Sequence, residues 1–258
     1  MNSPLTVTFL GTGTSQGVPV IGSDHPVCKS ANAKDKRLRV SVMISWDDYN
    51  FIIDCGPDFR QQMLREQVTR VDGVLLTHEH SDHTAGIDDI RPFYFRQGNI
   101  AFYAAERVFK ALHQRFAYIF EIENKYPGAP TIEEIEIHKD SRLDLGGKNV
   151  VVIEAFHNKL PVLGFKIDEF TYLTDVKTIS EEEIEKLKNT KVLVINALRE
   201  EAHQSHFNLS EALAFIKKVS PKRAYLTHIS HLLGFHDVVE KTLPKNVHLA
   251  YDRLKITL

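Results

Sequence analysis

Short apolar runs alternate with amphipathic stretches along most of the chain. Runs of apolar residues, or of alternating apolar and polar residues, predict β-strands, and apolar positions three and four residues apart predict helices. Strands are predicted at residues 5–10, 39–46, 50–54, 74–76, 100–104, 150–156, 161–167, 170–174, 192–197, 223–228 and 247–258. Helices are predicted at residues 58–67, 105–120, 180–188, 209–219 and 236–242. The strands therefore outnumber the helices.

The order of these elements favours two mixed β-sheets over one parallel, doubly wound sheet. The strands at 39–46 and 50–54 flank the polar pair Asp47 and Asp48, which predicts a β-hairpin early in the chain. Strands and helices alternate later on, so we expect helices to cover the outer faces of both sheets. No tract rich in serine, glycine and proline divides the sequence, which predicts a single domain over residues 1–258.

The composition changes this picture little. With 258 residues, 43% of them hydrophobic and 26% charged, the chain is typical of globular proteins. Its 32 basic and 34 acidic residues give a net charge of −2, which offers no argument for a broad nucleic-acid or membrane surface. Two cysteines, no signal-peptide pattern and no apolar run of roughly 20 residues predict a cytoplasmic protein. The 13 histidines are the unusual feature.

Four candidate metal ligands follow the predicted strand at 74–76 within six positions. They are His78, His80, Asp82 and His83. Residues two apart in an extended chain point the same way, so His78 and His80 can converge on one ion. A turn after them can carry Asp82 and His83 to a second ion. A polar loop with solvated imidazoles is the alternative interpretation.

Further candidate ligands stand at the ends of other predicted strands. They are His157, Asp175 and His228. Each of them alone is more typical of a surface or capping residue. Together with the first four residues they would complete two three-coordinate sets with one carboxylate between them.

The pattern His-x-His-x-Asp-His, with a His, an Asp and a His downstream, resembles the metallo-β-lactamase superfamily over essentially the whole chain. Segments 11–19 and 227–231 are similar to its PhnP-like phosphodiesterase branch, close kin of the tRNA 3′-processing ribonuclease Z. The resemblance implies an α/β fold, a four-layer αββα sandwich of two mixed β-sheets flanked by helices. It also implies that His78, His80 and His157 bind one metal ion, that Asp82, His83 and His228 bind another, and that Asp175 bridges the two.

This ligand set suits hydrolysis. Imidazoles and carboxylates without a thiolate fit Zn²⁺ or Mn²⁺. Two such ions can lower the pKa of water to about 7, which generates a hydroxide, and can offset charge that develops on a phosphate. We therefore expect a dinuclear metal-dependent phosphodiesterase acting on a small or cyclic nucleotide or ribose phosphodiester. The alternatives are a tRNA 3′-processing endoribonuclease-like enzyme and a non-catalytic metal- or nucleotide-binding module.

His206 and Asp54 are candidates for supporting roles. His206 aligns with an extra histidine that the resembled branch places near the scissile phosphate, which implies a general-acid or transition-state-stabilising role beside the metal ligand Asp82. A helix-flanking surface histidine is the alternative interpretation of His206. Asp54 ends an apolar strand, and we expect it either to orient a ligand histidine or to cap the helix region at 58–67.

The resembled branch often carries a structural zinc site, and here the matching positions are degenerate. Only His25, Cys28 and His231 remain as donors, and Ser23 is a poor fourth ligand. Because a structural zinc normally has four protein donors, an empty hydrogen-bonded cluster is favoured over bound zinc.

The remaining expectations concern partners. The basic run of Lys34, Lys36, Arg37 and Arg39 is interpreted as a solvated loop, because it lacks an aromatic platform. A small phosphodiester is therefore favoured over RNA as the substrate, and no membrane partner is expected. Apolar positions on the helix at 105–120 could serve the core or a dimer contact, and the resemblance makes a homodimer possible.

Overall fold

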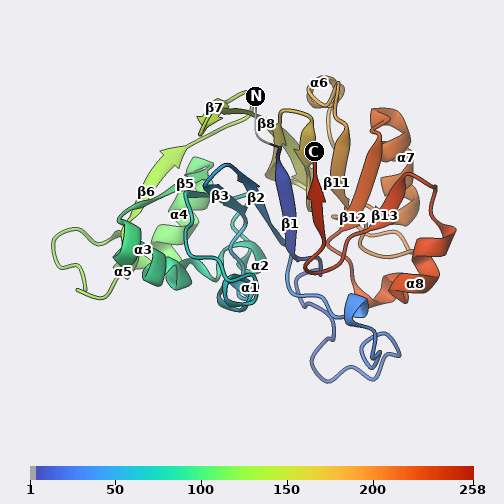
Figure 1. Cartoon of the computed structure of the whole chain (residues 1–258), viewed down its shortest axis with the longest axis horizontal. Coiled ribbons are helices and arrows are strands. Elements are labelled where there is room, and N and C mark those ends of the chain that lie inside the picture. Colours follow the sequence, from blue (N-terminus) through green and yellow to red (C-terminus); the bar gives the residue numbers. More distant parts are fainter. Residues whose placement is uncertain (1–3) are drawn as a thin grey trace.

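Two seven-stranded β-sheets pack face to face in the computed structural model, which describes residues 4–258 (Figure 1). The first sheet has the order β14 (Lys255–Thr257), β1 (Thr6–Gly11), β2 (Ser41–Trp46), β3 (Tyr49–Ile53), β4 (Gly73–Leu75), β5 (Ile100–Ala104) and β6 (Ile132–Glu136). The second has the order β13 (Val247–Leu249), β12 (Arg223–Thr227), β11 (Val192–Asn196), β10 (Phe170–Tyr172), β9 (Leu160–Ile167), β8 (Lys148–His157) and β7 (Arg142–Leu145). Both sheets contain parallel and antiparallel pairs, as predicted.

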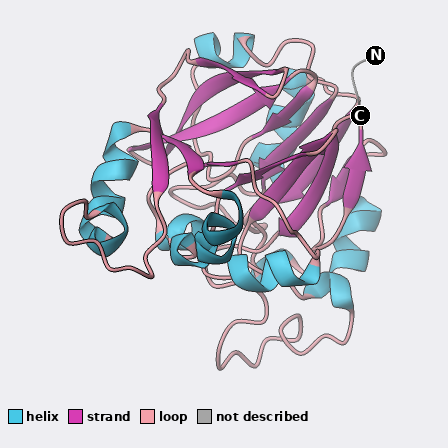
Figure 2. Ribbon diagram, turned by 60° about the vertical axis from the view of Figure 1, so that its left-hand side comes forward, coloured by secondary structure: helices cyan, strands magenta, loops and turns pink. Residues whose placement is uncertain are grey.

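Helices cover the outer faces of both sheets (Figure 2). They are α1 (Phe59–Arg65), α2 (Ser81–Thr84), α3 (Arg91–Gln97), α4 (Glu106–Arg115), α5 (Ala117–Phe120), α6 (Glu181–Glu185), α7 (Leu209–Val219) and α8 (His236–Val239). Short 3₁₀ turns occupy Ala33–Asp35, Ile87–Ile90, His231–Leu233 and Glu240–Thr242. The arrangement is the four-layer αββα sandwich expected from the sequence.

Alternating side chains separate the layers. Along β3, Phe51 and Ile53 lie in the core between the sheets, whereas Ile52 packs with the helices on the outer face. Burial of each large apolar side chain contributes about 1.5–3 kcal/mol, so this alternation holds the strand register. The apolar face of α4, including Phe109, is buried in the outer core. Those positions therefore serve the core.

The structure corrects several predicted elements. The β-hairpin is confirmed, because β2 and β3 pair antiparallel around Asp47 and Asp48. The predicted helix at 105–120 is wrong as a single element, since α4 ends at Arg115 and α5 begins after it. The predicted strand at 247–258 is also wrong, because β13 and β14 belong to different sheets. Strands β6 and β7 and helix α3 had not been predicted.

Within residues 4–258, no helix combines the length and apolar character needed to cross a membrane.

Candidate metal centre

The candidate ligands lie where strands of both sheets end. His78 and His80 are in the loop after β4, and Asp82 and His83 are in the short helix α2 that follows. His157 is the last residue of β8. Asp175 and His228 come shortly after β10 and β12. Both sheets therefore deliver their ligands to the same edge of the sandwich.

Left-handed backbone conformations turn the side chains of two of these ligands, and that of Asp54, into the site. Asp54, Asp175 and His228 have φ values of 64°, 59° and 54°. This region is uncommon for residues other than glycine, although aspartate and histidine are enriched in it. Such conformations cluster at functional sites, where the surrounding structure compensates for their cost.

The structure brings all seven candidate ligands together. The ring centroids of His78 and His80 are 4.6 Å apart, and those of His80 and His157 are 5.3 Å apart. Asp175 lies between the two sets. Its Oδ2 is 3.3 Å from Nε2 of His83 and its Oδ1 is 3.3 Å from Nε2 of His228, and its carboxylate also lies within 4.8 Å of ligand atoms of His78 and His157. Oδ2 of Asp82 lies 3.3 Å from Nε2 of His83.

The donor set fits divalent cations. Within the described chain, Nε2 of His83 and both ring nitrogens of His228 are buried without a hydrogen-bond partner. Buried polar atoms are seldom left unpaired in proteins. Nε2 of each of these histidines also faces Asp175 at ion-pair distance. A cation among these atoms would satisfy the imidazoles and neutralise the carboxylates, and mixed nitrogen and oxygen donors suit Zn²⁺ or Mn²⁺.

Asp54 lies directly beneath this cluster. Its carboxylate accepts hydrogen bonds from the amide and hydroxyl of Thr77, and its Oδ2 is 2.7 Å from Nδ1 of His83. Because the Thr77 hydroxyl donates to Asp54, it can accept from Nδ1 of His78, which lies 3.0 Å away. The structure thus places Asp54 against a ligand histidine, and α1 begins after Asp58 instead, so the capping alternative is wrong.

A backbone carbonyl orients His157 in the same way. Nδ1 of His157 lies 2.7 Å from the carbonyl oxygen of Ser205, which can only accept a hydrogen bond. The Nδ1 atom therefore carries the proton, and Nε2 of the neutral ring keeps its lone pair for a metal ion. Neither Thr77 nor Ser205 had been singled out in the sequence. Thr77 adjoins the histidine pattern and could have been found, whereas a carbonyl acceptor leaves no sequence signal.

The buried carboxylates and imidazoles of the site shift one another's pKa values. Burial alone would lower the pKa of His83, but Asp82, Asp54 and Asp175 outweigh it and raise that pKa well above the ordinary value. Burial would likewise raise the pKa of Asp175, but His228 and His83 hold it well below its usual range. A proton on His83 therefore supplies part of the charge that a bound cation would supply.

His78 behaves in the opposite way. Its pKa is lowered well below the ordinary value, mainly by burial and then by the neighbouring His83. The imidazole is therefore neutral near pH 7, which is the form that binds a metal ion.

His206 is part of the same cluster. Its Nε2 lies 2.9 Å from Oδ1 of Asp175, and its ring centroid is 4.4 Å from that of His157. The side chain is buried, so the interpretation as a helix-flanking surface residue is wrong. Burial lowers the pKa of His206 to about 4, against the hydrogen bond to Asp175. One of its ring nitrogens also lies close enough to a ring nitrogen of His157 and a carboxylate oxygen of Asp175 to share a metal ion.

An open hollow of about 490 Å³ adjoins the candidate ligands. It is lined by His80, His157, Asn158, Lys159, Leu160 and Ser205. Lys159 lies in the turn between β8 and β9, is exposed, and forms no ion pair within residues 4–258. A substrate that reaches the histidines through this hollow would therefore meet a free cation.

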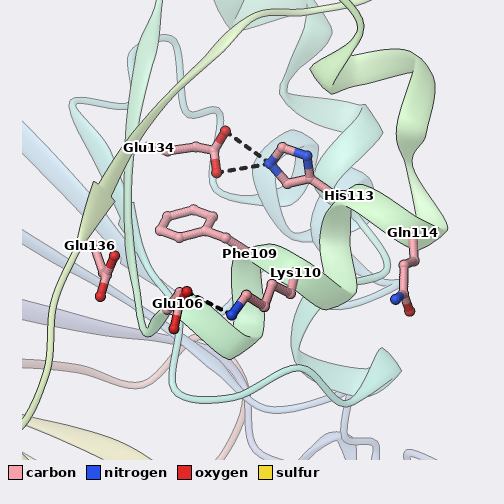
Figure 3. A pocket seen from close by; sticks show the side chains of 7 residues that line it. All are labelled: Glu106, Phe109, Lys110, His113, Gln114, Glu134 and Glu136. Carbon is pink, nitrogen blue, oxygen red and sulfur yellow. Dashed lines mark hydrogen bonds and ion pairs between the residues drawn. The ribbon is translucent and has the colours of Figure 1, made fainter.

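A second hollow, of about 600 Å³, lies between α4 and the edge strand β6 (Figure 3). Phe109 extends toward the strand, and four of the side chains around it form two pairs. Lys110 lies 2.6 Å from Glu106, and Nε2 of His113 lies 3.0 Å from Glu134. Among the described residues, no cluster of three candidate metal ligands falls here, so this hollow is not the candidate centre.

The degenerate zinc positions come only partly together. The rings of His25 and His231 pack edge to face with centroids 4.9 Å apart. Cys28 is buried, and its Sγ accepts a hydrogen bond from the amide of Val20 at 3.4 Å. Within residues 4–258, these three residues do not form a cluster of ligand atoms close enough to share an ion. Among the described residues, Nδ1 of His231 is buried without a hydrogen-bond partner, so the three side chains are not fully hydrogen-bonded, and the preference for an empty site stays a prediction.

The solvated-loop interpretation of the basic run is wrong for Arg37. Its side chain is buried, and Nη1 donates hydrogen bonds to the hydroxyl of Thr12 at 2.8 Å and the carbonyl of Ala250 at 2.6 Å. Arg39 pairs with Asp58 at 3.0 Å. These arginines join segments that are distant in sequence, a role that composition does not reveal.

Comparisons with known proteins agree with this fold. The family model of the beta-lactamase superfamily domain matches residues 49–229, a range that contains each of the seven candidate ligands. The class defined by the fold and the site is therefore that of metallo-β-lactamase-fold proteins.

A crystal structure of a new diphosphatase from the PhnP family superposes with a TM-score of 0.93. Its sequence is 35% identical, and the match covers 100% of this chain and 98% of that chain. The chain accordingly belongs to the beta-lactamase superfamily and, within it, to the PhnP family.

Two curated relatives are longer proteins. An octanoyltransferase of Porphyromonas gingivalis is 40% identical over 249 residues, which make up 96% of this chain and 50% of that protein. A ribonuclease Z of Methanopyrus kandleri is 24% identical over 176 residues, which make up 65% of this chain and 52% of that protein. The chain thus spans about half the length of these curated relatives.

Proposed function

We propose that this protein is a metal-dependent hydrolase that cleaves small phosphodiesters with two divalent cations, Zn²⁺ or Mn²⁺. One observation carries the proposal. Six imidazoles and two carboxylates from both sheets meet at one edge, and ring nitrogens of His83 and His228 are buried there without a hydrogen-bond partner among residues 4–258. His78, His80 and His157 would hold one ion, Asp82, His83 and His228 the other, and Asp175 would contact both.

Bound cations would supply Lewis acidity toward a phosphate oxygen and lower the pKa of water. The protein's own groups would keep the site ready for them. Asp54 and Thr77 orient His83 and His78, and the Ser205 carbonyl orients His157. These contacts fix which ring nitrogen carries a proton, so the other nitrogen stays free to bind.

We assign His206 to the stabilisation of charge on the departing group. With a pKa lowered to about 4, the imidazole is neutral near pH 7. A neutral ring carries one N–H, and here the N–H on Nε2 faces Oδ1 of Asp175. With Asp175 engaged by the cations, that N–H would become available to the departing group, which supports hydrogen-bond donation more than transfer of a proton from an imidazolium. A donor placed where negative charge develops can contribute a factor of about 10²–10³ to the rate.

The substrate class follows from the hollow and from the relatives. An open hollow with one free lysine suits a small anionic substrate. The crystallised PhnP-family relative is a diphosphatase, so diphosphate esters belong beside simple diesters among the test substrates. A tRNA-processing activity is the second candidate, supported by the similarity to ribonuclease Z over 65% of the chain.

The decisive experiment combines metal content with turnover. The purified protein would be stripped with a chelator, reloaded with Zn²⁺ or Mn²⁺, and assayed on a chromogenic diester, a diphosphate ester and precursor tRNA. We expect two ions per chain, hydrolysis of a small substrate, and loss of turnover in Asp82→Ala. Two bound ions without hydrolysis of any substrate would favour a binding module, and cleavage of precursor tRNA alone would favour the second candidate.

A further inference from the structure

Arg107 joins the two halves of the candidate metal centre. It lies in the first turn of α4, and its guanidinium donates from Nη1 to the carboxylate of Glu79 and from Nη2 to the carbonyl of Pro161. Glu79 stands between His78 and His80 in the loop after β4. Arg107 thus holds the loop of the first sheet against a strand of the second.

The second contact leads to the third histidine. Pro161 is paired with Phe156 in the antiparallel register of β8 and β9, and Phe156 immediately precedes His157. A backbone hydrogen bond of 2.9 Å from Leu163 to Thr77 also crosses between the two segments. A shift of the β8–β9 hairpin away from Arg107 would therefore move His157 relative to the histidines of the loop.

We infer that Arg107 is a positioning residue that sets the distance of His157 from His78 and His80, and with it the affinity of the ion these three would bind. The inference rests on the proposed function, because it assumes that the histidines bind metal. A planar guanidinium can donate to two acceptors at once with fixed geometry, whereas a lysine ammonium is a point charge on a flexible stem. Arg107 also forms an ion pair with the carboxylate of Glu79.

Arg115, from the last turn of α4, provides a useful contrast. Its Nη2 donates to the carbonyl of Glu79 at 2.8 Å and to the hydroxyl of Thr84 at 2.9 Å. Both partners belong to the loop and α2, and within residues 4–258 no hydrogen bond of Arg115 reaches β8 or β9. Arg107 differs in spanning the two sheets, which predicts that its loss affects one ion more than the other.

The test measures the affinities of both ions in Arg107→Ala, by competition with a chromophoric chelator during Zn²⁺ titration. We expect one of the two ions to bind at least about 10-fold more weakly, the loss typical when a residue that orients a ligand is removed. The affinity of the other ion should change less than about twofold. The affinity of Arg107→Lys should lie between those of Arg107→Ala and the wild type. Lys110 is on the same helix and, among residues 4–258, is paired with Glu106 alone, so Lys110→Ala should match the wild type.

The thermal midpoint of each metal-free variant separates positioning from general destabilisation. If Arg107→Ala does not fold, Glu79→Gln offers the same comparison, because it removes the charge that Arg107 contacts and keeps a side chain of similar shape. Equal affinities in the wild type and both variants would overturn the inference, and so would an equal loss at both ions. A wild-type chain that binds no ion would overturn the proposed function together with the inference, whereas unchanged affinities beside active enzyme would overturn the inference alone.

Discussion

Oδ2 of Asp54 lies 2.7 Å from Nδ1 of His83, and both side chains are completely buried beneath the candidate metal centre. The pKa of Asp54 is raised by burial, against the opposing effects of His83 and Thr77. Two groups that would each be costly to bury alone therefore compensate one another. The pairing also fixes which nitrogen of His83 faces the metal ligands.

Replacing Asp54 with asparagine tests this relationship. The amide keeps the size of the carboxylate but loses its charge, so the Nδ1 proton of His83 is held less firmly. We expect metal affinity to fall about 10- to 100-fold, as is typical when a residue that orients a ligand is changed. Chelator competition would measure the affinity, with Asp48→Asn in the exposed hairpin turn as the matched control. Equal affinities in the two variants would contradict the role of Asp54.

The raised pKa of His83 predicts how the metal-free protein responds to pH. A group whose pKa is higher in the folded state stabilises the fold fully below its unfolded pKa, about 6.5 for histidine, and this contribution is lost as pH rises through the folded pKa. Deprotonation of His83 leaves Asp54, Asp82 and Asp175 without that compensating charge. The thermal midpoint of chelator-treated protein should therefore fall as pH is raised from about 6.5 toward the alkaline range.

The metal-loaded protein is the control for this pH profile. Bound cations would replace the proton on His83. The thermal midpoint of the metal-loaded protein should therefore change much less over the same alkaline range. On the acid side the sign reverses, because the lowered pKa values of His78 and His206 make folding less favourable as pH falls below about 6.5. A metal-free protein that becomes more stable from neutral to alkaline pH would contradict the assignment of the proton to His83.

The sequence identified the residues that gather at the candidate site better than the residues that orient them. His78, His80, Asp82 and His83 follow a buried strand at diagnostic offsets, and the fold brings their distant partners to the same edge. The residues that orient them were harder to find. Ser205 acts through its carbonyl, which every residue has, and the cross-sheet contacts of Arg107 depend on tertiary packing alone.

The errors in the fold have a related origin. Apolar runs predict a strand but not its partner, so residues 247–258 gave no indication that β13 joins one sheet and β14 the other. The chain passes between the sheets near Arg253, which adopts a left-handed φ of 74°. Edge strand β6 was missed because most of its side chains are exposed or only partly buried, which leaves little of the apolar pattern that marks an interior strand.

His206 offers a test of the catalytic step apart from metal binding. In His206→Ala we expect kcat to fall by about 10²–10³, because one hydrogen-bond donor to developing charge is lost. Two ions per chain should remain, as measured by elemental analysis. Loss of one ion would instead identify His206 as a ligand, consistent with its position beside His157 and Asp175. Full turnover with both ions present would remove His206 from the mechanism.

Lys159 should affect substrate binding more than turnover. It lines the hollow beside His80 and His157 but belongs to neither proposed ligand set. Removing its charge in Lys159→Ala should raise KM for an anionic substrate several-fold, and the effect should shrink at high salt because exposed charges are screened. The kcat should stay nearly unchanged, since an interaction made equally in the ground and transition states affects KM alone.

Two further variants make the Lys159 prediction specific. Lys159→Arg keeps the positive charge and should retain a KM close to that of the wild type. Lys222→Ala removes an exposed lysine that immediately precedes β12, at the end of that strand away from His228, and should leave KM unchanged. An equal effect in Lys159→Ala and Lys222→Ala would show only that net charge matters. A fall in kcat with constant KM would instead place the lysine at the reacting phosphate, where it would act on the transition state.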